Sequence, residues 1–273
     1  MPQDLNDFPA PVPGPFELIA PDYNRMGFLN LIGQHLAAAA SLQPGEQVLD
    51  VATGTGHVAF AAARLVGETG AVTGLDLSPA MLAQARIRMR APDSRVTNLS
   101  FILGDGMHLP FGDERFSTVL CSAGLFFMSD LVDALREWRR VLRPGGRVGF
   151  TAFNPGMMAP LPALWAAQLA PYHLTAPGPP TGRLPSAERA WIILEEAGFS
   201  VERVSAETLP YRLERPEDRW SDIEAGLEGL PLRQLPEASR ASLRAAHLAE
   251  LETLFSAGPL TVDLPLTVAF GRR

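Results

Sequence analysis

The sequence predicts an α/β protein built on a doubly wound, mainly parallel sheet. Three observations lead to this fold class. An apolar strand, a glycine turn and an alanine-rich helix follow one another directly over residues 48–63. Strand and helix patterns then alternate as far as residue 153, and acidic residues close several of these strands. Because ligands of such sheets bind at the carboxyl ends of the strands, we expect a functional site there.

The composition narrows the class of protein. At 273 residues, with 47% hydrophobic and 19% charged residues, the chain can bury a full core. The formal net charge of −7 argues against a nucleic-acid partner, because phosphate contacts need a basic field. Cys121 is the only cysteine, which excludes an internal disulfide and a thiolate metal site and favours a reducing cytoplasm. No signal peptide and no integral membrane segment are expected.

The chain is expected to begin with a flexible arm, residues 1–20, ahead of one elaborated domain over residues 21–273. Prolines at positions 2, 9, 11, 13 and 15 disfavour a helix over residues 1–16. A helix is predicted over residues 26–40, and a Pro-Gly turn at residues 44–45 then leads into the first strand.

The first strand and its turn are the most informative stretch. Residues 48–51 (VLDV) read as a strand buried on both faces, residues 53–56 (TGTG) as a turn, and a helix follows from His57. The glycines allow close backbone approach to a ligand. Gly54 and Gly56 also fit the loose dinucleotide fingerprint. Asp50 separates the two interpretations, because its carboxylate would repel a pyrophosphate and suits a ligand that carries an ammonium group. Alternatively, Asp50 is a buried residue that caps the turn.

The alternation continues through the first half of the chain. The predicted strands are residues 71–75, 99–103, 116–122 and 146–153, and the predicted helices are residues 78–89 and 130–142. Ser78 and Pro79 predict the start of their helix, as N-cap and first-turn proline.

The second half has a different character. Residues 154–185 contain methionines, a tryptophan and many prolines, and this composition is interpreted as an insertion that covers another part of the protein. Further elements are predicted as helices over residues 186–197, 216–226 and 236–255 and strands over residues 200–211 and 262–270, the last irregular at Pro265 or starting after it. We expect residues 154–185 and 212–258 to form a partly helical cap that binds a substrate. A homodimer surface and a simple extension of the core are the alternatives.

Three carboxylates close three successive predicted strands and should line one edge of the sheet: Asp50, Asp76 and Asp105. Asp50 can hold an amino group, directly or through water, and Asp76 can accept both hydroxyls of a ribose. Asp105 can accept from the exocyclic amine of adenine, while the backbone N–H of Gly106 or Met107 reaches a ring nitrogen. Together these tasks describe S-adenosylmethionine.

With these residues in view, the chain resembles the class I S-adenosylmethionine-dependent methyltransferases, nearest to the subgroup that includes the ubiquinone and menaquinone biosynthesis enzymes. The matching motifs are residues 48–56 (VLDVATGTG), 74–82 (GLDLSPAML), 104–111 (GDGMHLPF) and 141–146 (VLRPGG). They occur in family order over roughly residues 20–153, and the Arg-Pro-Gly-Gly hairpin is not a dehydrogenase feature.

The resemblance implies a Rossmann-like, seven-stranded sheet with an antiparallel last strand, and methyl transfer from S-adenosylmethionine to oxygen, nitrogen or carbon of a small molecule. It also implies that Tyr23 lies beside the methionine part of the cofactor. The candidate cofactor-binding residues are Tyr23, Asp50, Ala52, Thr53, Gly54, Gly56, Asp76, Leu77, Met81, Gly104, Asp105, Gly106, Met107, Ser122 and Ala123. His108 and Tyr23 are the candidate catalytic residues, with an exposed loop position as the alternative for His108.

The chain departs from the subgroup at Phe126 and Phe127, where some relatives carry polar residues, often histidines. This predicts an apolar or aromatic acceptor and no catalytic base from that loop. The arginines at positions 136, 139, 140 and 143 are expected to form a solvated helix face. Two other functions stay open at this point: a nicotinamide-dependent oxidoreductase and a cofactor-binding protein that transfers nothing.

Overall fold

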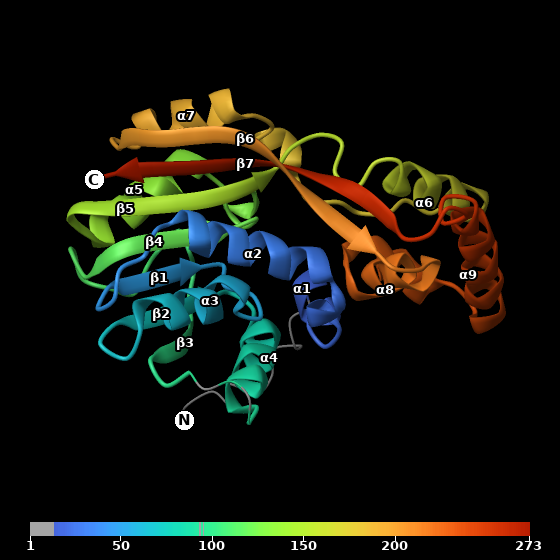
Figure 1. Ribbon diagram of the computed structural model, residues 1–273, viewed down its shortest axis with the longest axis horizontal. Coiled ribbons are helices and arrows are strands. Elements are labelled where there is room, and N and C mark those ends of the chain that lie inside the picture. The colour runs from blue at the N-terminus through green and yellow to red at the C-terminus, as the bar shows by residue number, and fades with distance from the viewer. Residues whose placement is uncertain (1–13, 93, 95) are drawn as a thin grey trace, which may run out of the picture.

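Seven strands form one sheet in the order β3-β2-β1-β4-β5-β7-β6 in the computed structural model, which describes residues 14–92, 94 and 96–273. The strands are β1 (Gln47–Val51), β2 (Ala71–Asp76), β3 (Leu99–Leu103), β4 (Phe116–Ser122), β5 (Leu142–Phe153), β6 (Ser200–Leu213) and β7 (Leu260–Arg272). β1 to β5 pair in parallel, whereas β7 is antiparallel to both of its neighbours. The predicted doubly wound, mainly parallel sheet of seven strands is confirmed (Figure 1).

Helices cover both faces of this sheet, because its strands are apolar on both sides. The α-helices are α1 (Pro15–Ile19), α2 (Gly27–Ala39), α3 (His57–Val66), α4 (Pro79–Arg90), α5 (Leu131–Val141), α6 (Leu161–Leu169), α7 (Ala187–Glu196), α8 (Pro216–Ala225) and α9 (Glu237–Glu252). One core packs α3 and parts of α2 and α4 against the sheet, and the other packs α5 and α7. Successive residues of β1 go to opposite cores, Val48 to the first and Leu49 to the second.

Local signals begin the helices where the sequence places them. The Ser78 hydroxyl accepts a hydrogen bond from the Met81 N–H over 3.1 Å and caps α4, whose first residue is Pro79. The Asp130 carboxylate caps α5 by accepting from the N–H groups of Val132 and Asp133. Two predicted strands, β3 and β4, have the predicted bounds.

The expected flexible arm is wrong for its last residues. Residues 1–13 lie outside the described part of the chain, but α1 begins at Pro15 and its Ile19 is buried. Pro15 occupies the first turn of this helix, where the missing N–H costs nothing, so the proline that was expected to oppose a helix begins one.

The expected irregularity at Pro265 is also wrong. β7 continues through Pro265, which is opposite Thr208 of β6. The carbonyl of Pro265 accepts from Asn154 N–H over 2.9 Å, directly after the end of β5 at Phe153. The missing N–H of the proline therefore faces Asn154 at the end of β5, so the pairing of β7 with β6 does not depend on it.

The segments expected to form a cap do pack together. α6, α8, α9 and the 3-10 segment η5 (Leu227–Gln234) form a helical lobe beyond the ends of the long strands β6 and β7 (Figure 1). Its own core is built around Trp165 and Trp220, whose rings meet edge to face with centroids 5.9 Å apart. No helix of the described residues is long and apolar enough to cross a membrane.

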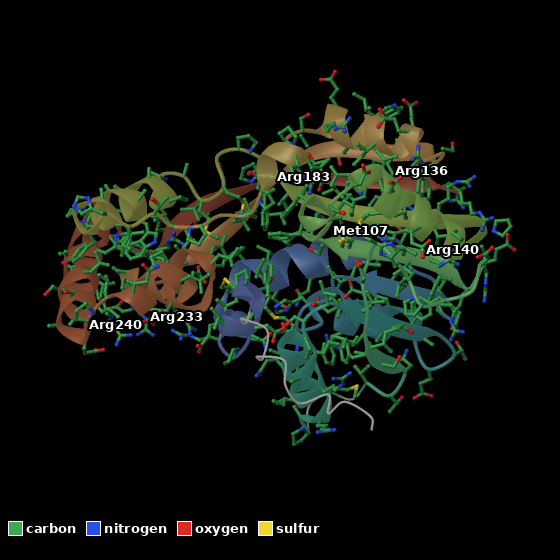
Figure 2. All side chains as sticks on the ribbon, turned by 180° about the vertical axis from the view of Figure 1, so that it is seen from behind. Met107, Arg136, Arg140, Arg183, Arg233 and Arg240 are labelled. Atoms are coloured by element: carbon green, nitrogen blue, oxygen red, sulfur yellow. The ribbon has the colours of Figure 1, made fainter. Side chains whose placement is uncertain are left out.

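Arg136 and Arg140 of α5 lie on the outer side of the sheet domain, away from Arg233 and Arg240 of the lobe (Figure 2). The arginine face of α5, which was expected to be only solvated, also makes ion pairs and hydrogen bonds with the protein. Arg140 pairs with Glu137 and Asp113 at 2.7 Å each and donates to the Phe111 carbonyl, so it holds the loop after residue 108. Trp138, on the same helix, is fully buried.

Candidate active site

Asp50 lies behind the glycine turn rather than in a cavity. Its carboxylate accepts from the Thr53 hydroxyl at 2.5 Å and from the Ala59 N–H at 3.0 Å, so it ties the turn to the first turn of α3. Burial raises the pKa of Asp50 to about 7. The turn-capping alternative thus describes the contacts of Asp50, and direct contact with a bound amino group is not supported. An approach through water stays a prediction.

Asp76 closes β2 at the entrance of the same turn. One carboxylate oxygen accepts from the Gly54 N–H at 2.7 Å and the other from the Ser78 N–H at 2.9 Å. Burial raises the pKa of Asp76, and these two hydrogen bonds oppose that effect. A carboxylate has about four acceptor sites, so Asp76 keeps about two for the hydroxyls of a ribose.

Asp105 organises the loop after β3. It accepts from Met107 N–H at 2.8 Å, which lowers its pKa, and lies 3.1 Å from Nδ1 of His108. Because Met107 N–H is used inside the loop, Gly106 is the better candidate for the predicted adenine contact. Trp138 of α5 also holds this loop, since its indole N–H donates to the Gly106 carbonyl over 2.8 Å. No local pattern in the sequence indicates this role of Trp138.

A cavity of about 200 Å³ lies at the carboxyl ends of β1, β2, β3 and β4. The order of the sheet reverses between β1 and β4, which is the position where open α/β sheets bind their ligands. The predicted residues that line it are Tyr23, Ala52, Gly54, Asp76, Leu77, Met81, Gly104, Asp105, Gly106, Ser122 and Ala123. Four predicted residues do not line it: Asp50, Thr53, Gly56 and Met107. Phe16, Leu75, Gly124, Phe127 and Met128 line it without having been predicted.

Two residues that line this cavity have a strained backbone. Ala52 follows β1 and Ala123 follows β4, and both have left-handed φ angles, 54° and 51°. Such a conformation is costly for a residue with a side chain and is concentrated at functional sites. The Ala123 N–H is held by Thr151, through the carbonyl and the hydroxyl oxygen at 3.1 Å each.

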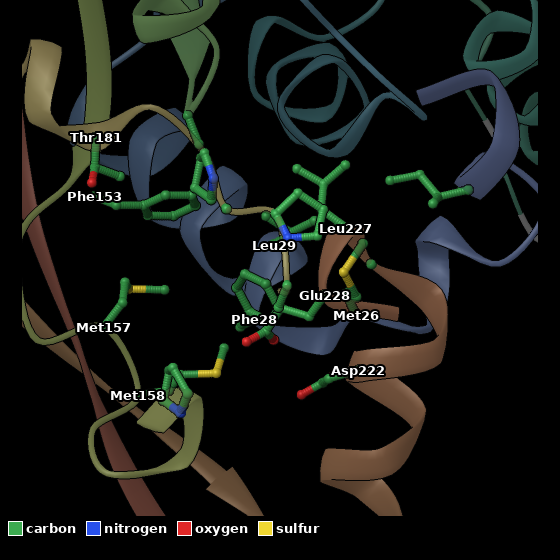
Figure 3. Close-up of a pocket in the computed structure, with 18 of the residues that line it drawn as sticks. Met26, Phe28, Leu29, Phe153, Met157, Met158, Thr181, Asp222, Leu227 and Glu228 are labelled. Atoms are coloured by element: carbon green, nitrogen blue, oxygen red, sulfur yellow. The ribbon is translucent and has the colours of Figure 1, made fainter. Parts of the chain in front are cut away.

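A second, larger cavity of about 700 Å³ lies between the sheet domain and the lobe. The insertion lines it with Met157 and Met158 (Figure 3) and with the proline-rich stretch 177–179, whereas its role as a cap over a substrate stays a prediction. Four residues line both cavities: Phe16, Tyr23, Ala123 and Phe127. The two cavities therefore adjoin at this shared wall.

Tyr23 is held at the shared wall by its neighbour. The Thr55 hydroxyl, inside the glycine turn, donates to the Asn24 side chain over 2.6 Å. Burial and the nearby Asp76 carboxylate raise the pKa of Tyr23, so the phenol stays protonated. Tyr23 is thus placed between the two cavities, as a contact to the methionine part of a cofactor requires.

His108 does not lie at either cavity. Its side chain is 83% exposed, and its partner is Asp105. The catalytic role considered for His108 is not supported, and the exposed loop position describes it. Phe127 lines both cavities, and its ring meets that of Phe16 edge to face, with centroids 5.1 Å apart.

Arg183 fastens the insertion to this loop. From the short helix η4 (Thr181–Arg183), its guanidinium donates to the carbonyls of Phe126, Met128 and Ser129. The contact joins the covering segment to the residues on either side of Phe127. No local pattern in the sequence indicates this pairing.

Sequence comparison agrees with this geometry. Residues 48–146 match the family described as methyltransferase domain. The ubiquinone/menaquinone biosynthesis C-methyltransferase of Proteus mirabilis is 34% identical over 158 residues, 56% of this chain and 62% of the relative. The chloroplastic 2-phytyl-1,4-beta-naphthoquinone methyltransferase of Arabidopsis thaliana is 37% identical over 146 residues, 51% of this chain and 56% of the relative. The chain thus spans about three fifths of the length of these relatives.

Solved structures share the fold at low sequence identity. A methyltransferase of Haloferax volcanii, solved with its activator Trm112, covers 96% of this chain and 98% of its own, with a TM-score of 0.59 and 18% identity. An S-adenosylmethionine-dependent methyltransferase of Aquifex aeolicus covers 64% and 84%, with a TM-score of 0.51 and 22% identity. The cyclase SpnF covers 97% and 99%, with a TM-score of 0.56 and 21% identity.

These similarities cover the sheet and the loops that line the smaller cavity, and they favour no dehydrogenase. The chain has the fold of the class I S-adenosylmethionine-dependent methyltransferases, its residues 48–146 match a methyltransferase domain, and its sequence is similar to the ubiquinone and menaquinone biosynthesis methyltransferases.

Proposed function

We propose that the chain is an S-adenosylmethionine-dependent methyltransferase that acts on a small apolar or aromatic molecule. The observation that carries this proposal is the wall shared by the two cavities, formed by Phe16, Tyr23, Ala123 and Phe127. A cofactor in the smaller cavity would adjoin an acceptor in the larger one. The printed names of the curated relatives support an aromatic acceptor, since they refer to ubiquinone, menaquinone and a naphthoquinone.

The residues of the smaller cavity fit the cofactor. Asp76 would accept from the ribose hydroxyls with the two acceptor sites that Gly54 and Ser78 leave open. Asp105 and the Gly106 N–H would hold the adenine, and Tyr23 would contact the methionine part. When bound, S-adenosylmethionine supplies a methyl group that its sulfonium already activates for displacement.

The chain's own contribution is alignment and exclusion of water. The acceptor would be oriented by the apolar walls of the larger cavity, and the edge-to-face rings of Phe16 and Phe127 would exclude water where the cavities meet. No lysine, arginine or histidine is among the described residues that line the larger cavity. We therefore expect the acceptor atom to be nucleophilic without a strong base from the protein.

Calorimetric titration tests the cofactor, with S-adenosylhomocysteine and NADH as the two ligands. Binding of S-adenosylhomocysteine alone is expected, and heat with NADH alone would contradict the proposal. Transfer is tested with S-adenosylmethionine labelled at the methyl group and a panel of hydroxylated and amino-substituted naphthalenes. Label in an extracted product supports methyl transfer.

A cofactor-binding protein without transfer is the second candidate. The fold is shared with SpnF, whose printed name is that of a cyclase, so the fold alone does not require methyl transfer. Binding of S-adenosylhomocysteine without label transfer to any acceptor would support this candidate. A cytoplasmic location and a homodimer stay predictions, the latter tested by light scattering of the full chain.

A further inference from the structure

The larger cavity is apolar on most sides but carries charge on one. Two carboxylates, Asp222 and Glu228, line it, while its described lining includes no cationic side chain. Both come from the lobe, Asp222 from α8 and Glu228 from η5. Figure 3 shows Asp222 pointing from its helix into the cavity, opposite Met158. The charge of the cavity is therefore negative unless these carboxylates are neutralised.

Glu228 is neutralised by Arg219. The two guanidinium nitrogens Nη1 and Nη2 of Arg219 lie 2.8 and 2.9 Å from the two carboxylate oxygens of Glu228. Arg219 is itself buried, with 1% of its surface exposed, so the pair is fixed in place. In this bidentate geometry, each carboxylate oxygen of Glu228 accepts one hydrogen bond from Arg219.

Asp222 has no such bidentate partner among the residues that the structure describes. Of these residues, only Tyr211 donates to it through its hydroxyl, over 3.2 and 3.4 Å to its two oxygens, although Asp222 is just 3% exposed. A buried carboxylate with one long hydrogen bond out of about four possible is costly. A donor supplied from the cavity would remove that cost. Burial raises the pKa of Asp222 to about 7, so a cationic donor would also favour its charged form.

The remaining walls of the cavity also accept a cation better than an anion. The rings of Tyr23, Phe28, Phe127 and Phe153 line it, and aromatic faces attract ammonium groups. An acidic acceptor such as a phenolate would instead meet the carboxylate of Asp222, whose charge Arg219 offsets only in part because its guanidinium is paired with Glu228. The cavity thus discriminates by charge as well as by shape.

We propose that the acceptor is an apolar molecule that carries a protonated amine, and that Asp222 binds this amine. The proposal rests on the proposed function and narrows its substrate class. Asp222 lines the larger cavity but not the smaller one, so the amine is held away from the shared wall and another atom of the acceptor faces it. Asp222 is then the residue that determines specificity.

Binding of matched probes to the full chain tests the proposal at pH 8. The probes are 2-(1-naphthyl)ethylamine, its N,N,N-trimethyl derivative, 2-(1-naphthyl)ethanol and 1-naphthylacetic acid, titrated by calorimetry. The primary amine is expected to bind at least tenfold more tightly than the alcohol, and the acid most weakly. Equal affinities for amine and alcohol, or tighter binding of the acid, would overturn the proposal. The trimethyl derivative separates charge from hydrogen bonding, and an affinity above that of the alcohol is expected.

The matched variants are Asp222→Asn and Glu252→Gln, which each remove one carboxylate from the lobe without changing its size. Glu252 is exposed on α9 and does not line the cavity. Asp222→Asn should reduce the preference for amine over alcohol to within about twofold, while Glu252→Gln should keep it. A preference that survives Asp222→Asn would refute the role of Asp222.

Two further measurements keep the test decisive. If Asp222→Asn does not fold, as judged by circular dichroism, the comparison of probes on the wild-type protein decides alone. Titration with S-adenosylhomocysteine uses a different cavity, so its failure counts against the proposed function and leaves the amine preference to be judged separately.

Discussion

The Gly54 N–H donates to the Asp76 carboxylate over 2.7 Å, which joins the glycine turn after β1 to the end of β2. Each residue lines the smaller cavity, so one hydrogen bond aligns two parts of the candidate cofactor site. Asp76 consequently has two roles, one in shaping the turn and one in binding. Experiments on this residue must separate them.

Asp76→Ala should weaken cofactor binding by roughly 2–4 kcal/mol, because two ribose hydroxyls lose a charged acceptor. Asp76→Asn should cost less, since one acceptor oxygen remains. Calorimetry with S-adenosylhomocysteine measures the binding, and thermal melting without ligand measures the cost to the fold. If the dissociation constant of the alanine variant equals that of wild type, Asp76 is not in the site.

Two glycine variants distinguish the cavity from the core. Gly54 has φ 55° and lines the cavity, and a Cβ there would lie 3.7 Å from the Tyr23 ring. Gly56 has φ 88°, but a Cβ there would lie 3.0 Å from the rings of Phe60 and Phe101, in the core. Gly54→Val should therefore abolish the stabilisation that ligand gives, with a folded protein remaining.

Gly56→Val should instead lower the melting temperature of the ligand-free protein, through strain and overpacking of about 2 kcal/mol or more. The sequence alone predicts loss of cofactor binding with an intact fold for this variant. The structure changes that expectation, because the added side chain would not point into the cavity. Differential scanning calorimetry with and without S-adenosylhomocysteine tests both variants, and a Gly56→Val protein that melts like wild type would contradict the packing argument.

Arg183→Ala should loosen the insertion over the larger cavity. The variant removes the donors to the Phe126, Met128 and Ser129 carbonyls, at a cost of about 1 kcal/mol because the site is partly exposed. The Michaelis constant for the acceptor should rise, while the affinity for S-adenosylhomocysteine should stay close to that of wild type. Arg143→Ala, at an exposed position near the start of β5, is the matched control. An equal effect of both variants would contradict the fastening role.

The stability of the protein should depend on pH through Asp222. Its pKa is raised to about 7 in the folded protein, chiefly by burial, with Glu228 and Asp218 adding to the rise and Arg219 and Tyr211 opposing it. Because the folded state then holds the proton more tightly than the unfolded state, this group favours folding less and less as pH rises from about 4 to about 7. Above that window, the loss reaches about 4 kcal/mol.

Asp222→Asn removes this dependence. The difference in free energy of unfolding, variant minus wild type, should therefore be larger at pH 8 than at pH 5. Urea unfolding of both proteins at the two pH values measures the difference. A relative stability that does not change with pH would show that Asp222 titrates normally.

The strands, the glycine turn and the capped helices could be predicted because their signals are local. Runs of apolar residues predict the strands, Ser78 and Asp130 cap the helices that follow them, and Asp76 ends β2 while Asp105 follows β3. Parallel pairing then brings the strand ends to one edge. Most of the predicted cofactor-binding residues consequently line one cavity.

The tertiary structure decided what depends on residues far apart in the chain. The direction in which Gly56 faces, the meeting of Phe16 with Phe127, and the contact of Arg183 with the loop of Phe126 have no local period in the sequence. The same holds for Asp222, which reads as one more polar residue of a charged helix but is buried against Tyr211 at the larger cavity. Local patterns report which side of an element is apolar, whereas its packing partners follow only from the way the whole chain fills its core.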